Sequence, residues 1–218
     1  MKKKKLAPQY SKGEEICNSL SHFVGFVLSA VAFVYMIVVA MQSGDWLRVF
    51  SVIVYGIAMM LLFAMSTCYH AVRNPKIKGV FRIFDHCAIF LLIAGTYTPY
   101  MLITLRGTIG WVIFGIIWGM AILGIVLNAI NMEKFSIFSL ICYVIMGWAA
   151  VFAIRPLVAN LSSLGVSLLV AGGVVYTIGV LFYLMKKVPY MHSLWHLFVL
   201  GGSMLHLGSI IFCVLPIM

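Results

Sequence analysis

Seven stretches of this sequence are each long and apolar enough to cross a lipid bilayer as one helix. A hydrocarbon core of ~30 Å requires about 20 mostly apolar residues. Charged residues fill only 9% of the 218 positions, whereas soluble domains carry about 25%. Turn-forming residues separate the stretches, and Arg155-Pro156 is expected to end the fifth. We therefore predict an all-α, polytopic membrane protein with seven transmembrane helices at residues 16–42, 47–72, 80–105, 109–131, 136–155, 162–186 and 190–216.

Residues 1–15 are expected to form a basic cytoplasmic tail, and residues 16–218 a single seven-helix transmembrane domain. The chain begins with Met1 and four lysines, which resembles the start of a signal peptide. Residues 6–15 (LAPQYSKGEE) are then too polar for the apolar core that a signal peptide would have there, so we expect no cleavage. No stretch would form a folded basic domain, so the net charge of +10 does not indicate a nucleic-acid partner.

Lysines and arginines, which lie between the predicted helices or at their ends, are unevenly divided between the two sides of the membrane. Twelve lie on the side of the N-terminus, and the other side has only Arg48, Arg106 and Arg155. Cytoplasmic loops carry an excess of Lys and Arg. We therefore predict a multi-pass protein of the cell membrane with a cytoplasmic N-terminus and an external C-terminus. Its basic side would face anionic membrane lipids, which accounts for the net charge.

The last apolar stretch begins with two histidines, His192 and His196, spaced four residues apart. On a helix this spacing places both imidazoles on one face, one turn apart, so that both can reach one metal ion. An unpartnered polar group in lipid costs several kcal/mol, so the pair needs a reason to be there. Two interfacial histidines that face water are an equally good interpretation of the spacing alone.

The predicted topology brings other polar residues to the depth of this pair. Five of the six histidines and three of the five acidic residues fall in the cytoplasmic leaflet. His70 ends the second helix there, and Asp85 and His86 begin the third. The first helix opens there with Glu14, Glu15, Asn18 and His22. This convergence indicates a functional site, because polar residues without a shared role would be spread over both leaflets.

We predict that His70, His192 and His196 bind a metal ion. Three neutral imidazoles with one open position are typical of catalytic zinc sites, although histidine also suits copper, iron and nickel. Ser66 lies one turn before His70 and could reach the same space, or could bond to its own helix backbone. Asp85 is the predicted catalytic acid–base residue, since an aspartate within a membrane usually marks function. Alternatively, Asp85 is a charge near the N-terminus of its helix, favoured by the helix dipole and paired with Arg82.

Other polar residues have weaker predictions. His86 lies about 100° around the helix from Asp85, so we expect it at the interface or in a supporting position. His206 lies about 21 Å beyond His192 along its helix, which predicts a core hydrogen bond rather than metal binding. Glu14 fits a capping box with Ser11. Glu15, Asn18 and His22 share one helix face and could support the site or join helices, and we slightly favour the second role.

Four motifs, in order, resemble the progestin and adiponectin receptor (PAQR) family. Residues 15–22 (EICNSLSH) are similar to its ExxNxx[ST]H opening, and residues 66–70 (STCYH) to its SxxxH motif. Asp85 occupies its acidic position in the third helix, and residues 192–196 match its closing HxxxH. The resemblance covers nearly the whole chain, and the short format resembles the bacterial hemolysin III branch.

The resemblance implies a cytoplasmic-side zinc held by the three histidines, with Asp85 and Ser66 near the reacting water. It also implies distant kinship with membrane-embedded alkaline ceramidases, which hydrolyse lipid amides. We therefore expect a zinc-dependent hydrolase acting on a lipid amide or ester. A pore-forming hemolysin and a receptor or sensor with a structural zinc are the alternatives. The longer N-terminal domain of eukaryotic relatives is absent here, so hormone recognition is not expected.

Overall fold

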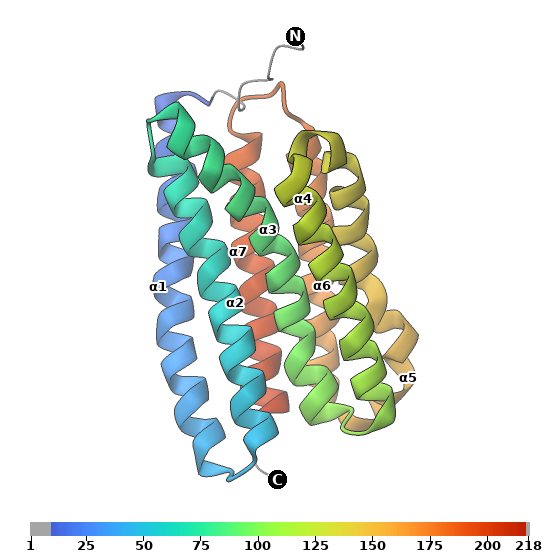
Figure 1. The fold of residues 1–218 in the computed structure, drawn as a ribbon. Coiled ribbons are helices and arrows are strands. Elements are labelled where there is room, and N and C mark those ends of the chain that lie inside the picture. Colours follow the sequence, from blue (N-terminus) through green and yellow to red (C-terminus); the bar gives the residue numbers. More distant parts are fainter. Residues whose placement is uncertain (1–9, 217–218) are drawn as a thin grey trace.

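The computed structural model describes residues 10–216, which are almost entirely helical and contain no strand within that range. Figure 1 shows the long helices side by side in one bundle. In chain order the elements are α1 (Lys12–Gln42), α2 (Trp46–Ala71), α3 (Pro75–Pro99), the π-helix η1 (Tyr100–Thr104), α4 (Thr108–Trp148), the 3-10 helix η2 (Ala149–Ala153), α5 (Ile154–Asn160), α6 (Ser163–Leu184), α7 (Met191–Ser209) and the π-helix η3 (Ile210–Val214).

Six helical segments in the described part of the chain are long and apolar enough to cross a membrane. One of them, Thr108–Asn160, is 53 residues long and contains non-helical backbone at Asn131 (φ −160°, ψ 85°). The side chain of Asn131 accepts a hydrogen bond from the backbone N–H of Lys134, as a helix N-cap does. In Figure 1 the chain turns back at this level and descends beside its first half. The all-helical, multi-pass membrane character predicted from the sequence is confirmed.

The helices are apolar on the outside and partly polar inside, which is the arrangement expected in lipid. Along α1, Val31 is 67% exposed and Val34 63% exposed. The buried face of the same helix is made of small and polar residues: Asn18, His22, Gly25, Ser29, Ala32, Met36 and Ala40. Small residues allow close helix approach where no hydrophobic force drives association, and buried polar groups can bond across the interface.

The packing order brings the ends of four helices together. Helix α1 packs against α2 and α7, α2 packs against α3, and α7 packs against α6. The start of α1, the end of α2, the start of α3 and the start of α7 lie at the same end of the bundle (Figure 1). The polar residues near these helix ends are therefore brought to one depth.

Several helix boundaries differ from those predicted. Helices α1 and α3 begin before the apolar stretches, because Ser11 with Glu14 forms a capping box and Asn74 caps a helix that has Pro75 in its first turn. Arg155-Pro156 does not end a helix, which corrects that prediction, and both residues lie in the first turn of α5. Proline is tolerated there because a first-turn N–H has no intrahelical partner to lose.

Candidate metal centre

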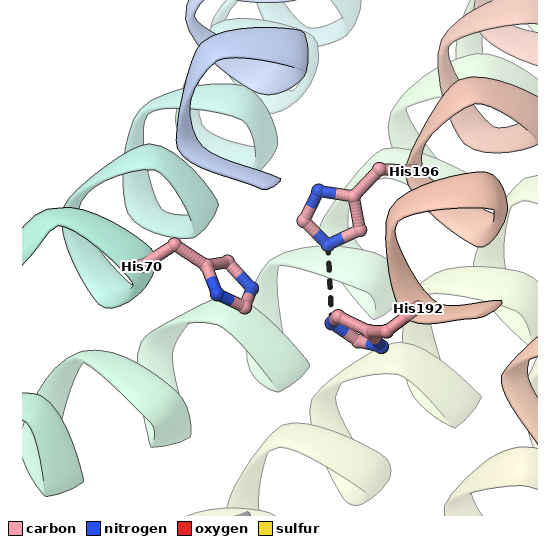
Figure 2. Close-up of side chains that lie close together, drawn as sticks. All are labelled: His70, His192 and His196. Atoms are coloured by element: carbon pink, nitrogen blue, oxygen red, sulfur yellow. Dashed lines mark hydrogen bonds between the residues drawn. The ribbon is translucent and has the colours of Figure 1, made fainter. Parts of the chain in front are cut away.

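Three histidines from two helices converge near the end of the bundle where α1 begins (Figure 2). His70 lies in the last turn of α2, and His192 and His196 lie in the first two turns of α7. One ligand nitrogen from each lies within 4.8 Å of the others. His70 and His196 are buried, at 3% and 2% exposure, and His192 is half-buried. This group could hold a metal ion.

The two histidine nitrogens of α7 are spaced as two ligands of a tetrahedral ion would be. The Nε2 atoms of His192 and His196 are 3.2 Å apart. Two nitrogens bound at 2.0–2.1 Å with tetrahedral angles would be about 3.3 Å apart. The Nε2 of His70 is buried and has no hydrogen-bond partner among residues 10–216. A buried nitrogen without a partner is costly unless another group satisfies it, and a metal ion would do so.

A carboxylate from α1 fixes the orientation of His70. Its Nδ1 lies 2.7 Å from Oε2 of Glu15, and a carboxylate can only accept, so Nδ1–H is the donor. The other Glu15 oxygen pairs with the ammonium of Lys78 at 2.9 Å. With the proton on Nδ1, the lone pair of His70 is on Nε2, the nitrogen directed at the candidate metal position. A carboxylate behind a ligand histidine is the usual way in which proteins orient such a ligand.

Asn18 orients His196 of α7 in the same way. Its backbone carbonyl accepts a hydrogen bond from Nδ1–H of His196 at 3.1 Å, which leaves Nε2 of His196 as the ligand nitrogen. Its side-chain oxygen accepts from the hydroxyl of Ser193 at 2.5 Å. Its side-chain nitrogen makes a longer contact, 3.4 Å, with Nδ1 of His70. One residue of α1 therefore contacts the site histidines of both α2 and α7.

Two aromatic contacts enclose the histidines. The ring of His22 stacks on His196 with centroids 3.7 Å apart, and neither of its nitrogens has a partner in the described part of the chain. The ring of Tyr10 stacks on His192 with centroids 4.7 Å apart. Glu15, Asn18 and His22 thus support the site rather than serving only to join helices, which corrects the role favoured from the sequence.

A cavity of about 140 Å³ lies against the histidines. Ser66, Asp85, His192 and His196 line one part of it, and apolar side chains from α3, α4 and α6 line much of the rest. The hydroxyl of Ser66 is buried and has no hydrogen-bond partner among the described residues, so it does not bond to its own helix backbone. Asp85 is 9% exposed. The cavity is lined by a carboxylate, a free hydroxyl and two of the three converging histidines.

Three further predictions can be compared with the structure. Asp85 does not pair with Arg82, whose ion-pair partner is Glu133 at 3.9 Å. His86 lines the same cavity as Asp85, which agrees with the supporting position expected for it. His206 makes the expected core hydrogen bond, between its Nε2 and the carbonyl of Leu169 at 3.0 Å.

Two residues of the site, Tyr10 and Ser193, were not predicted from the sequence. Tyr10 precedes the first helix and Ser193 lies between the two histidines of α7. Neither carries a signal that separates it from an ordinary interfacial residue. Their positions against His192 and Asn18 follow only from how α1 and α7 pack.

Replacing Glu15 with glutamine is expected to lower the affinity for added zinc by about 10–100-fold, the usual effect of losing the group behind a ligand histidine. A neutral amide accepts the Nδ1–H of His70 more weakly than a carboxylate does, so the ligand is less well oriented. Competition with a chromophoric chelator measures the change. Glu133→Gln removes an exposed carboxylate and serves as the control. Equal affinity of Glu15→Gln and wild type would contradict the role given to Glu15.

Comparison with known proteins identifies the lineage of this site. A family model described as "Haemolysin-III related" matches residues 10–207. The chain is 47% identical over 203 residues to "Hemolysin-3" of Bacillus cereus, covering 93% of each chain. The chain belongs to the haemolysin-III family. The resemblance to PAQR proteins, and to their bacterial hemolysin III branch, is therefore confirmed.

The chain has further relatives in bacteria and in animals. It is 42% identical over 202 residues to the "Hemolysin-3 homolog" of Bacillus subtilis (strain 168), with 93% of each chain covered. It is 28% identical over 163 residues to the human "Monocyte to macrophage differentiation factor", covering 72% of this chain and 67% of the human one. These names describe different biological outcomes. The chemistry of the site must therefore be inferred from its residues rather than from the names of the relatives.

Proposed function

We propose that this haemolysin-III protein is a zinc-dependent hydrolase of lipid amides or esters. Its metal would be held by His70, His192 and His196. The observation that carries the proposal is the convergence of these three imidazoles beside an unpaired Ser66 hydroxyl and the Asp85 carboxylate, all at one end of the bundle. A structural zinc site is usually closed by four protein ligands, whereas three histidines leave a position open for reaction.

The roles of the chain's own residues follow from their chemistry. Bound zinc supplies Lewis acidity, which lowers the pKa of water toward ~7 and polarises a carbonyl group. Asp85 would orient the attacking water and accept its proton. Ser66 would donate its hydroxyl hydrogen to the oxygen on which negative charge develops. The acyl C–N or C–O bond breaks, the acyl carbon gains the hydroxyl of water, and the departing amine or alcohol gains the proton from Asp85.

A lipid substrate is supported by the surroundings of the site. The cavity continues from the histidines between apolar side chains such as Leu92, Ile93 and Val199, which suit an alkyl chain. The described part of the chain is a helical bundle without a further domain in which a water-soluble substrate could bind. The site lies near the end of the bundle, where acyl chains meet headgroups in a membrane.

We also propose that the chain crosses the membrane seven times, with α4 crossing once on each side of Asn131, and that the metal centre faces the cytoplasm. The turn at Asn131 and the distribution of Lys and Arg support this topology. In a cysteine-free background, Gln42→Cys should react with an impermeant maleimide added outside intact cells, and Lys134→Cys should not. External labelling of Lys134→Cys would contradict a membrane crossing by the part of α4 that precedes Asn131.

Elemental analysis and a turnover assay of the purified protein test the hydrolase together. We expect about one zinc per chain and release of fatty acid from at least one amide or ester lipid in a broad panel. Mass spectrometry of co-purified lipids would indicate which members of the panel to test first. Zinc-loaded protein that turns over no member of the panel would overturn the proposed reaction and leave the metal centre intact.

Membrane lysis is the second candidate, because the 47% identical relative is named Hemolysin-3. A pore needs a polar path through the full depth of the bundle, whereas Met101, Ile210 and Leu215, near the opposite end, are at most 1% exposed. Reconstituted protein should therefore show no conductance. Conductance that survives His192→Ala with His196→Ala would establish a pore that does not depend on the metal centre.

A further inference from the structure

A second cavity, of about 400 Å³, lies beside the candidate metal centre at the same end of the bundle. It is formed by the segment before α1, the ends of α2 and α6, the start of α3 and the connection between α6 and α7. The proposed reaction does not use it. Its polar lining is dominated by cations and phenols: Arg82, Lys186, Lys187, Tyr10, Tyr69 and Tyr183.

The cationic side chains of this cavity have few ion pairs or hydrogen bonds with other described residues. The Arg82 side chain is only 19% exposed, yet its guanidinium makes no hydrogen bond within residues 10–216. Its ion-pair partner, Glu133, is 3.9 Å away and 41% exposed. The ammonium of Lys186 lies 5.4 Å from the centroid of the Tyr183 ring, and neither it nor Lys187 has an ion-pair partner in the described range. A half-buried arginine without strong partners indicates a site for an anion.

The one carboxylate that lines this cavity is already occupied. Glu14 accepts from the backbone N–H of Ser11 at 2.9 Å and from that of Tyr190 at 2.8 Å, one bond to each oxygen. Glu14 therefore joins the start of α1 to the start of α7. It is not paired with any of the three cations that line the same space.

Three phenols add hydrogen-bond donors. The hydroxyls of Tyr10, Tyr69 and Tyr183 make no hydrogen bond to any residue that the structure describes, and their rings line the cavity. Guanidinium, ammonium and phenol donors around one space match an anion with several acceptor oxygens. Phosphate has three or four such oxygens and carries up to two negative charges, whereas a carboxylate has two oxygens and one charge.

The two cavities are adjacent. His86, Tyr183 and His192 line both of them. A molecule with its polar head in the larger cavity and an alkyl chain in the smaller one would have its connecting bond near His192. That is where the proposed hydrolysis takes place.

We infer that the larger cavity binds a phosphate-bearing headgroup, so that the substrate is an anionic lipid whose acyl linkage lies between its phosphate and its alkyl chain. The substrate part of this inference rests on the proposed hydrolase function, whereas phosphate binding does not. Lys186 and Lys187 would also be expected on the cytoplasmic side for topology alone. That explanation does not account for a half-buried Arg82 or for the three free phenols.

Calorimetric binding to the full chain in neutral detergent tests the inference. The probes are a short-chain diacylglycerol phosphate, the same diacylglycerol without phosphate, and inorganic phosphate. Wild type should bind the phosphate lipid at least about tenfold more tightly than the neutral one, since each charge-assisted bond lost costs about that factor or more. Arg82→Gln, and separately Lys186→Gln with Lys187→Gln, should each weaken this binding about tenfold. The backbone carbonyl of Arg82, which accepts from His86, is kept in that variant.

Arg73→Gln with Lys76→Gln is the matched control. Both residues are exposed, lie between α2 and α3 or at the start of α3, and do not line the cavity. Equal binding of the two lipids, or equal loss in control and cavity variants, would overturn the phosphate site. If inorganic phosphate binds as tightly as the phosphate lipid, the phosphate site is supported, but the inference that a lipid headgroup occupies it is overturned. Zinc content, measured alongside, should not change in any variant.

The outcome is separable from the fate of the proposed reaction. Phosphate lipid that binds in an Arg82-dependent way without turnover supports the site and contradicts the hydrolase. Turnover of neutral and phosphate lipids with equal kcat/KM, unchanged by Arg82→Gln, supports the hydrolase and overturns the inferred substrate class.

Discussion

Asp85→Asn is expected to lower lipid turnover by about 10²–10⁴-fold, the usual contribution of a positioned general base, while bound zinc stays at the wild-type level. Asparagine has nearly the same shape as aspartate but cannot accept a proton from water. Asp85 is not among the three converging ligand residues, so its amide should not release the metal. Fatty-acid release and zinc content are measured on the same preparation.

Asp45→Asn is the control for this substitution. Asp45 caps α2 and pairs with Arg106 away from the metal centre, and asparagine is an equally good N-cap. Turnover of Asp85→Asn at the wild-type rate would contradict the role of Asp85 and favour a sensor whose metal is structural. Loss of zinc from Asp85→Asn would instead show that the carboxylate is a ligand.

His196→Ala is expected to remove zinc almost completely and to abolish turnover. Only two of the three imidazoles would remain, and the imidazole that Asn18 orients would be lost. The stacking contact with His22 would also be lost. Elemental analysis beside wild type measures the metal, and size-exclusion chromatography measures whether the bundle is still folded.

His206→Ala is the matched control, because it removes a histidine from the same helix about 15 Å further along and should leave zinc in place. If His196→Ala does not fold, His192→Ala asks the same question at a half-buried position, where truncation leaves a smaller void. Full zinc occupancy in a folded variant of either kind would contradict the assigned ligand set.

The fold was predictable because the membrane limits the choices. Backbone polar groups must be satisfied within each crossing, so long apolar stretches are helices. The boundaries were less predictable, since capping at Ser11 and Asn74 extends α1 and α3 beyond the apolar residues. The prediction at Arg155-Pro156 was wrong because proline is compatible with a helix start as well as with a helix end.

The candidate site was predictable in its three converging histidines but not in its surroundings. Spacing and depth selected His70, His192 and His196, and the structure brings their nitrogens together. The depth of a histidine along its helix does not determine which side chain of a neighbouring helix it contacts. The support of His70 by Glu15 and of His196 by Asn18 was therefore undetermined from the sequence, and so was the place of His86 in the wall of the cavity.

The sequence by itself determined that this chain is a helical membrane protein, and it singled out the histidines of α2 and α7, because apolar length and helical period are local properties. Only the tertiary structure decided that α1 supplies the groups behind those histidines, and that a basic, phenol-lined cavity adjoins them. Those arrangements depend on how helices far apart in the sequence rotate and pack against one another. That rotation is set by many small contacts along α1, α2 and α7, and no single motif encodes it.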